Sequence, residues 1–292
     1  MSYNYEELSW SDVKDMLRKW RETTDRKSES IVQLWEAVLE EKMGKLGNER
    51  HIILEQVVIA ALDCGRMDIA DKCMKELIAE FPDSMRVHRL KAMRFEMLES
   101  YDKALEILDG IIKKDETNPS ARKRKVAILK AKGMNLEAIA EICDYLTKFM
   151  SDQEAWHELC NLYLQEADFE KAVFCMEELL LHNPHSYLLH LRIADIRYTM
   201  GGTENMETAK SYYLYAIKLN PTNLRALYGL YLCCLHITNS KTVLAKRKEA
   251  QTLGQWALTQ ISEKNSKRKS KTSNKYIAAL DSAFANMDIK GK

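Results

Sequence analysis

The pattern of apolar and polar positions predicts two helices within residues 152–184. Apolar or small residues recur there with the i, i+3/i+4, i+7 spacing of an amphipathic helix. The first series is Ala155, Trp156, Leu159, Cys160 and Tyr163, and the second is Phe169, Ala172, Met176 and Leu179. The polar segment 165–168 separates them, and Pro184 ends the second because proline lacks an N–H and disfavours helix in the residue before it. The stretch is therefore predicted to be two antiparallel helices joined by a tight turn.

This helix pair recurs along the chain. Alanine is found at intervals of 34 residues, and then of 37 where three residues are inserted near Gly201, giving Ala70, Ala104, Ala138, Ala172 and Ala209. A small side chain at a fixed place is expected where two helices cross closely. The repeat predicts five units, 51–84, 85–118, 119–152, 153–186 and 187–223, with Trp156 at position 4 of the fourth and with Pro82, Pro184 and Pro221 near the ends of theirs.

The 34-residue period with these residue types resembles the tetratricopeptide-repeat family. The resemblance implies an all-α, right-handed superhelical solenoid whose first helices line an inner groove. We expect helical caps at both ends, because the terminal elements of a solenoid cover its exposed core. The expected parts are an N-terminal helical cap (1–50, with helices at 9–22 and 28–45), a degenerate sixth helix pair (224–262), a basic linker (263–275), and a short C-terminal helix with a tail (276–292).

Composition narrows the classes of function. The chain has 292 residues, 46% of them apolar, but only 4 prolines and 10 glycines, which favours an all-α protein. The formal net charge of +1 argues against a protein built around a nucleic-acid surface. No apolar stretch of a secretory signal follows the N-terminus, and the longest apolar run, Ala226–Ile237, is shorter than the about 20 residues that span a bilayer. We expect a soluble protein without a membrane span.

Candidate chemistry is sparse, and we expect no catalytic residue, no cofactor and no metal. The chain has no glycine-rich phosphate loop and no nucleophile motif. His157 and Glu158 are adjacent, so they point to different sides of a helix and do not form an acid–base pair. The seven cysteines are scattered without a CxxC motif and are predicted to be buried hydrophobes in a reducing compartment. His182, His185 and His190 surround a turn, but without the ligand spacing of a zinc site.

Charge is segregated between the predicted units and suggests a groove that binds a partner. The segments 85–95 and 119–132 contain no acidic residue, whereas 152–178 contains eight and only one lysine. The resemblance implies that positions 2, 5, 9 and 12 of each first helix face a bound polypeptide, which places Arg86, Arg89, Lys123, His157 and Asn161 there. We expect the three basic residues to hold an acidic segment of a partner, because no acid in their own helices neutralises them. A solvated outer face is the alternative.

Two other kinds of repeat protein fit less well. Tetratricopeptide co-chaperones hold chaperone C-termini in a carboxylate clamp, and Lys123 and Arg192 match two of its places in one register. Its other places are occupied by Ala127, Glu158 and Leu188. RNA-binding helical repeats carry a base-reading residue in every unit, whereas the basic residues here concentrate in two. A co-chaperone or another cytosolic adaptor for peptide tails remains the alternative function.

Several sequence blocks beyond the general repeat positions resemble the subunit 2 family of the endoplasmic reticulum membrane protein complex. They are DMLRKWRE (15–22), EQVVIAALDCGRMDIA (55–70), residues 152–185, YTMGGTEN (198–205) and RALYGLY (225–231). The resemblance implies a non-enzymatic scaffold, peripheral on the cytoplasmic face of the endoplasmic reticulum, in an insertase for tail-anchored and multipass proteins. The implied partners are the cytosolic segments of the membrane-spanning subunits and a soluble subunit numbered 8 or 9.

Overall fold

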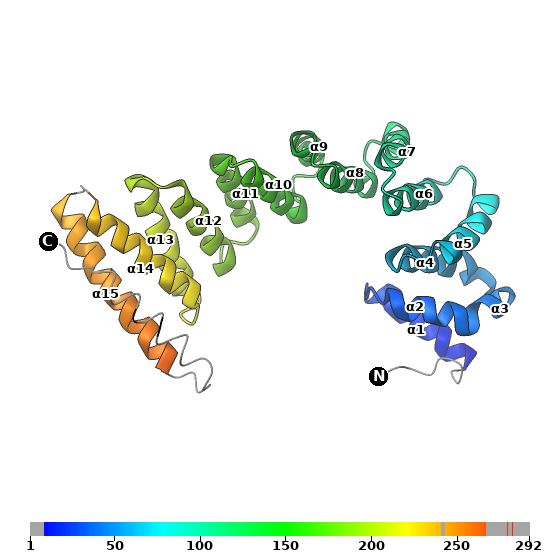
Figure 1. Cartoon of the computed structure of the whole chain (residues 1–292), viewed down its shortest axis with the longest axis horizontal. Helices are drawn as coiled ribbons and strands as arrows, with labels where there is room; N and C mark the ends of the chain where they lie inside the picture. The colour runs from blue at the N-terminus through cyan, green and yellow to red at the C-terminus, as the bar shows by residue number, and fades with distance from the viewer. Residues whose placement is uncertain (1–8, 241–242, 267–278, 280–281, 283–292) are drawn as a thin grey trace. The chain divides into compact units, whose positions relative to one another are not determined.

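The computed structural model describes residues 9–240, 243–266, 279 and 282, and no β-strand occurs among them. The all-α class predicted from the sequence is therefore confirmed (Figure 1). The helices are α1 (Trp10–Glu22), α2 (Ser28–Leu34), α3 (Glu40–Lys42), α4 (Arg50–Asp63), α5 (Met67–Glu80), α6 (Met85–Met97), α7 (Tyr101–Lys114), α8 (Pro119–Ala131), α9 (Asn135–Lys148), α10 (Gln153–Gln165), α11 (Phe169–His182), α12 (Tyr187–Met200), α13 (Thr203–Leu219), α14 (Leu224–Asn239) and α15 (Leu244–Ser266).

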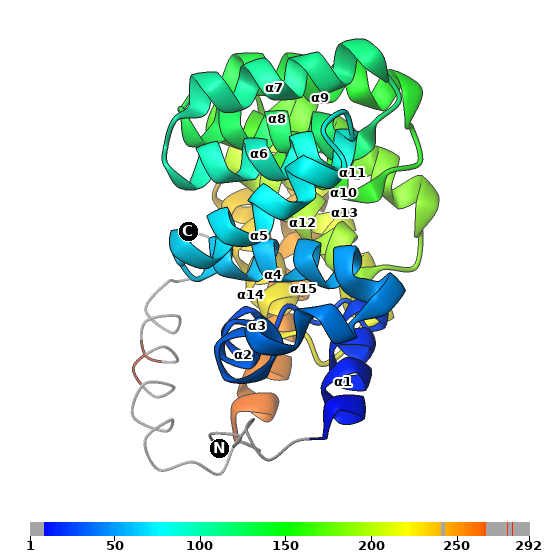
Figure 2. The same cartoon turned by 90° about the vertical axis from the view of Figure 1, so that its right-hand side faces the viewer.

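The chain divides into two compact units, Met1–Glu141 and Ile142–Lys292. In the first unit α4 packs on α5, and α6 packs on α7. In the second unit the packed pairs are α10 with α11, α12 with α13 and α14 with α15. Figure 1 shows these pairs side by side, and α6 and α7 are again neighbours in the turned view of Figure 2. Each pair of consecutive helices is the architectural element that the repeat predicts.

The five repeated alanines are completely buried, with exposed fractions of 0% at Ala70, Ala104, Ala138, Ala172 and Ala209. Each lies in the second helix of a pair. A longer side chain at these positions would separate the two helices, because protein interiors are close-packed. Two of the first helices begin at capping side chains: the Asp152 carboxylate accepts from the Ala155 N–H at 3.2 Å at the start of α10, and Asn118 caps α8 in the same way.

The first helix in three of the predicted repeats is fastened to the preceding turn by the same hydrogen bond. The donor is a side-chain N–H at position 4, and the acceptor is the backbone carbonyl six residues earlier, at position 32 of the preceding repeat. The pairs are Arg122 Nε with Glu116 O (2.9 Å), Trp156 Nε1 with Met150 O (2.8 Å) and His190 Nε2 with Pro184 O (2.9 Å). We call this the position-4 hydrogen bond. Its donors are three chemically different side chains.

The N-terminal cap differs in part from the prediction. Helix α1 starts after Ser9, whose hydroxyl accepts from the Asp12 N–H, and its Leu17 side chain is buried. The single helix expected over residues 28–45 is instead interrupted: α2 passes into a π-helical stretch, Trp35–Leu39, before α3. Trp35 is 2% exposed in this stretch. A π turn leaves a hydrophobic pattern close to that of an α-helix, so the sequence did not predict it.

At the other end, α15 continues to Ser266. The linker predicted from residue 263 is therefore wrong for 263–266, where Asn265 is 5% exposed and its side-chain amide donates to the Tyr228 hydroxyl at 3.4 Å. The rest of the predicted linker (267–275) lies outside the described residues, as does almost all of the predicted C-terminal helix and tail (276–292). Of the helices that the structure describes, none has both the length and the apolar character needed to cross a lipid bilayer.

Candidate partner-binding surfaces

The first candidate surface lies in the first unit, between α4 and α6. Glu55 on α4 accepts hydrogen bonds from the guanidinium groups of two arginines on α6, Arg86 and Arg89, the latter at 3.2 Å. The Glu55 side chain is only 14% exposed, whereas that of Arg86 is 67% exposed. Two positive charges thus share one largely buried carboxylate, which leaves this surface with a net positive charge.

This geometry corrects one prediction. The arginines were expected to stay unneutralised because the segment 85–95 contains no acidic residue, but Glu55 lies beside them in space. Glu55 and Arg89 are 34 residues apart and occupy position 5 of consecutive repeats. The repeat arithmetic that located Arg89 therefore also located its partner, and this signal was missed.

A pocket of about 200 Å³ adjoins these charges. Its apolar wall includes Ile52, Leu77 and Phe81, and the Phe81 ring meets the His51 ring edge-on, with 4.9 Å between the centroids. Arg86 and Glu55 stand at the same pocket. An apolar side chain fits this wall, while a neighbouring carboxylate would reach the exposed part of the Arg86 guanidinium.

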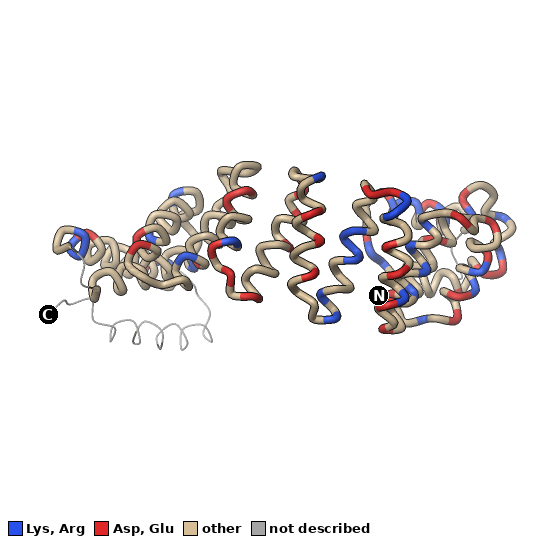
Figure 3. Tube along the Cα trace, turned by 90° about the horizontal axis from the view of Figure 1, so that it is seen from above, with Lys and Arg blue, Asp and Glu red and all other residues tan. Residues whose placement is uncertain are grey.

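The basic helix α8 is neutralised in the same manner, by acids on neighbouring helices. The buried Arg122 pairs with Glu141 at 3.2 Å, and Lys125 with Asp109 at 2.9 Å. Arg124 pairs at 2.7 Å with Glu96, whose pKa is raised by burial and partly lowered again by this arginine. Figure 3 shows basic and acidic positions interleaved through this part of the chain. Lys123 is the exposed basic residue of the predicted set on this helix.

The second candidate surface lies in the second unit, on α10 and α12. His157 and Asn161 are both exposed, and the Asn161 side-chain carbonyl accepts from Arg192 at 3.3 Å. Burial and the positive charge of Arg192 lower the pKa of His157 below its usual range, so the imidazole is neutral at pH 7. The surface thus offers a neutral ring, an amide and one guanidinium, which suits hydrogen bonding to a polar segment.

The cysteines are poor candidates for reaction. Burial raises the pKa of Cys73, Cys175 and Cys234 to about 12 in each case. A thiol reacts as the thiolate, so these groups are unreactive at neutral pH. Within the described ranges, no group of three His, Cys, Asp or Glu side chains is arranged to hold a metal ion. The chemistry that the two surfaces support is hydrogen bonding and ion pairing through the side chains described above.

Comparison with known proteins identifies relatives along most of the chain. A family model described as the EMC2 TPR-like repeat domain matches residues 67–207. ER membrane protein complex subunit 2 of Xenopus tropicalis is 48% identical over 256 residues, which cover 87% of this chain and 86% of that protein. The protein of the same name from Dictyostelium discoideum is 32% identical over 264 residues, covering 86% of this chain and 81% of that protein.

A solved structure has the same fold. The C-terminal part of a TPR repeat-containing protein from Cytophaga hutchinsonii superposes with a TM-score of 0.60, covering 84% of this chain and 94% of that one. Its sequence is 15% identical, so the likeness concerns the fold alone. The tetratricopeptide-repeat fold predicted from the 34-residue period is thereby confirmed.

Proposed function

The chain belongs to the family of subunit 2 of the endoplasmic reticulum membrane protein complex, and from this membership we propose that it is a scaffold subunit of that complex. The observation that carries the proposal is the 48% identity, which extends over 87% of the chain. The likeness thus extends beyond the residues that every tetratricopeptide repeat needs for packing. Stacked helix pairs suit a scaffold, because they present long surfaces to extended segments of other proteins.

In the proposed role the protein is peripheral, on the cytoplasmic face of the endoplasmic reticulum membrane. It holds the cytosolic segments of the membrane-spanning subunits together and seats a soluble subunit, numbered 8 or 9. The complex inserts tail-anchored and multipass proteins, and the insertion step belongs to the membrane-embedded partners. The protein itself binds and positions, without a catalytic residue or a cofactor.

We further propose that Arg86, Arg89 and Lys123 on one side, and His157 and Asn161 on the other, contact these partners. The support comes from Arg86, whose side chain is 67% exposed although its guanidinium pairs with Glu55. A guanidinium has five N–H donors, so it can bind Glu55 and a second carboxylate together. An acidic segment with an apolar residue beside it would satisfy both Arg86 and the adjoining pocket.

Affinity purification of the tagged chain from detergent-solubilised membranes tests the assembly. We expect the membrane-spanning subunits and one soluble subunit to co-purify, and alkaline carbonate to release the chain from the membranes. Recovery of cytosolic chaperones without any membrane subunit would refute the proposal and favour the adaptor alternative.

A second purification tests the surface. Arg86→Gln with Lys123→Gln removes two positive charges from the proposed contact residues on α6 and α8. The matched control Arg26→Gln with Arg66→Gln removes two from exposed arginines elsewhere in the same unit. We expect the first pair to reduce co-purification and the control pair to preserve it, with both retaining the helical circular dichroism spectrum. Equal recovery by the two variants would exclude this surface and leave membership of the complex intact.

A further inference from the structure

The position-4 residue of the fifth repeat, His190, carries a polar atom that the fold does not use. His190 is 9% exposed, and its Nε2 makes the position-4 hydrogen bond to Pro184 O at 2.9 Å. A carbonyl only accepts, so Nε2 carries the proton and Nδ1 of the neutral ring is an acceptor. Nδ1 is buried without a hydrogen-bond partner. Such an atom is costly to leave unpaired, and a bound group that donates a hydrogen bond to it would remove that cost.

The fourth repeat shows that the fold itself does not require this acceptor. Trp156 occupies position 4 there and makes the same bond to Met150 O through its indole N–H. An indole has no second polar atom, so nothing is left unsatisfied. Histidine at the equivalent place adds an unused acceptor.

His190 lines a shallow groove of about 450 Å³ between α11, α12 and α13. The other lining residues are Leu180, Leu181, Pro184, Ser211, Tyr212 and Tyr215. The Tyr215 ring lies 4.5 Å from the imidazole, centroid to centroid, and the Tyr212 ring lies 5.9 Å from it. Leu181 is 77% exposed at the surface of the molecule. The polar side-chain groups among these residues are the imidazole, the Ser211 hydroxyl and the two phenol hydroxyls, and the other lining side chains are aliphatic.

The aromatic ring that packs against the position-4 side chain comes from different positions in the fourth and fifth repeats. In the fourth repeat, Phe174 packs edge-on against the position-4 ring of Trp156, with 6.1 Å between the centroids. The register set by Ala172 and Ala209 places Ser211 at the position equivalent to Phe174. The Ser211 hydroxyl is itself engaged with the Glu207 carbonyl at 3.2 Å. The rings beside His190 come instead from Tyr212 and Tyr215, and the Tyr215 side chain is partly exposed.

We propose that this groove binds a tryptophan side chain of a partner protein, with the indole N–H donating to Nδ1 of His190. Tyr215 is 38% exposed, and we expect its ring to turn outwards to admit the indole. Phenylalanine fits the walls but leaves Nδ1 unpaired. Lysine or arginine would bring a charge among leucines, with no carboxylate lining the groove. Tryptophan combines a large apolar ring with a single donor and no acceptor.

The inference does not rest on the proposed function, because a small probe tests it on the isolated full-length chain. The probes are N-acetyl-tryptophanamide and its 1-methyl derivative, which has the same ring without the N–H. Binding is followed by NMR of the chain labelled with ¹⁵N-histidine, in which the imidazole nitrogens report hydrogen bonding directly. We expect the N–H probe to bind about threefold to tenfold more tightly than the methylated one, the range that one hydrogen bond confers.

The informative variant is His190→Trp. It supplies an N–H for the bond to Pro184, as Trp156 does in the fourth repeat, but no acceptor, so it should keep the thermal midpoint and lose the discrimination between the two probes. His236→Phe, a change at an exposed histidine on α14, is the control and should retain the discrimination. Equal binding of both probes by the unmodified chain, the absence of binding, or a shift at a histidine other than His190 would each overturn the proposal.

Discussion

Replacing Gly229 with alanine should destabilise the protein, although the same change usually stabilises a helix. Gly229 lies inside α14, and alanine is favoured over glycine in a helix interior by about 1 kcal/mol. A Cβ added at Gly229 would, however, lie 2.4 Å from two ring atoms of Tyr213. Real contacts of a Cβ are longer, so the ring or the helix has to move.

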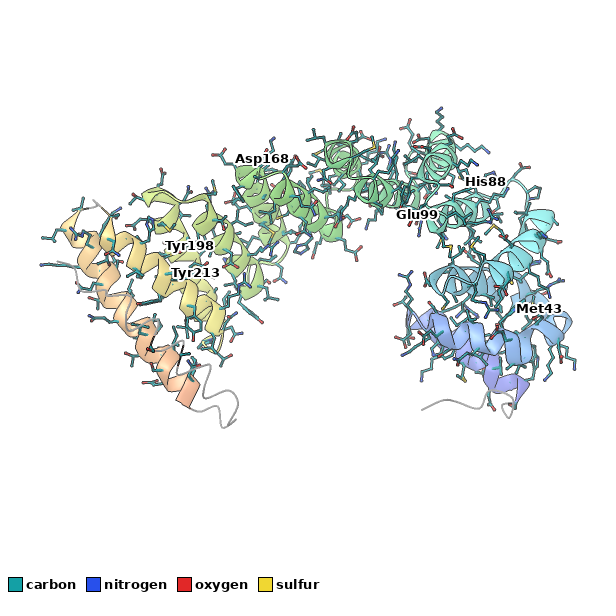
Figure 4. All side chains as sticks on the ribbon, in the orientation of Figure 1. Met43, His88, Glu99, Asp168, Tyr198 and Tyr213 are labelled. Atoms are coloured by element: carbon teal, nitrogen blue, oxygen red, sulfur yellow. The ribbon has the colours of Figure 1, made fainter. Side chains whose placement is uncertain are left out.

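The Tyr213 ring has little freedom to move. It is 2% exposed, and its hydroxyl donates to Asp195 at 2.7 Å, while the same carboxylate accepts from Arg225 at 2.7 Å. Figure 4 labels Tyr213, on α13, and Tyr198, on the preceding helix, and both belong to the same hydrophobic cluster. Overpacking of a filled core costs about 1–3 kcal/mol. After the gain in helix propensity, we expect Gly229→Ala to cost up to about 2 kcal/mol and to lower the thermal midpoint by up to about 6 °C.

The matched control is Gly110→Ala in α7, where nothing lies within 4 Å of the added Cβ. This change should stabilise by up to about 1 kcal/mol, so the two substitutions are expected to differ in sign. Thermal unfolding followed by circular dichroism measures both. In a Tyr213→Ala background, the cost of Gly229→Ala should disappear. The reasoning fails if Gly229→Ala raises the midpoint as Gly110→Ala does.

The remaining predictions concern packing, hydrogen bonding and pH. Ala138→Leu should cost about 1–3 kcal/mol in denaturant unfolding, because Ala138 is 0% exposed, and an unchanged midpoint would contradict close packing there. Trp156→Phe removes the donor to Met150 O and should cost about 0.5–1.5 kcal/mol, whereas an unchanged stability would show that the position-4 hydrogen bond is dispensable. Hydrogen bonds from Arg26 and Ser28 lower the pKa of Asp63. The stability that Asp63 contributes is therefore complete above its unfolded pKa of about 3.9 and is lost as the pH falls through the lowered folded value. Asp63→Asn should be less stable at pH 7, and its stability should converge with that of the unmodified chain at acidic pH in urea titrations; a constant difference would refute the assignment.

The fold was predictable because the residues that determine it recur at a regular interval along the sequence. Ala70 and its counterparts mark each close helix crossing, and the 34-residue interval sets where each pair begins and ends. The π-helical stretch Trp35–Leu39 was not predictable, since it leaves the apolar pattern almost unchanged. The end of α15 was also missed, because a polar segment such as 263–266 has the composition of a linker whether or not Asn265 finds a buried partner.

The candidate surfaces were predictable only in part. The repeat positions located Arg86 and Arg89, whereas Glu55, at the position equivalent to Arg89, was missed, and which charges remain exposed depends on side-chain geometry. The unused acceptor of His190 depends on even more: the tautomer, the Pro184 carbonyl and the absence of a ring at Ser211 all have to be seen together. A histidine in the sequence looks the same whether or not its second nitrogen has a partner.

The short sequence separation of the tertiary contacts has a consequence for how the chain folds. The hydrogen bonds between neighbouring helix pairs join residues such as Glu55 and Arg86, which are 31 apart, or Lys210 and Glu249, which are 39 apart. Chains whose contacts are this local close only short loops during folding, and they fold fast for their size. A growing chain emerging from the ribosome can therefore complete one helix pair against the previous one after about 40 further residues. Folding then proceeds from the N-terminus in small steps, and α4 and α5 are packed before α14 and α15 have been translated.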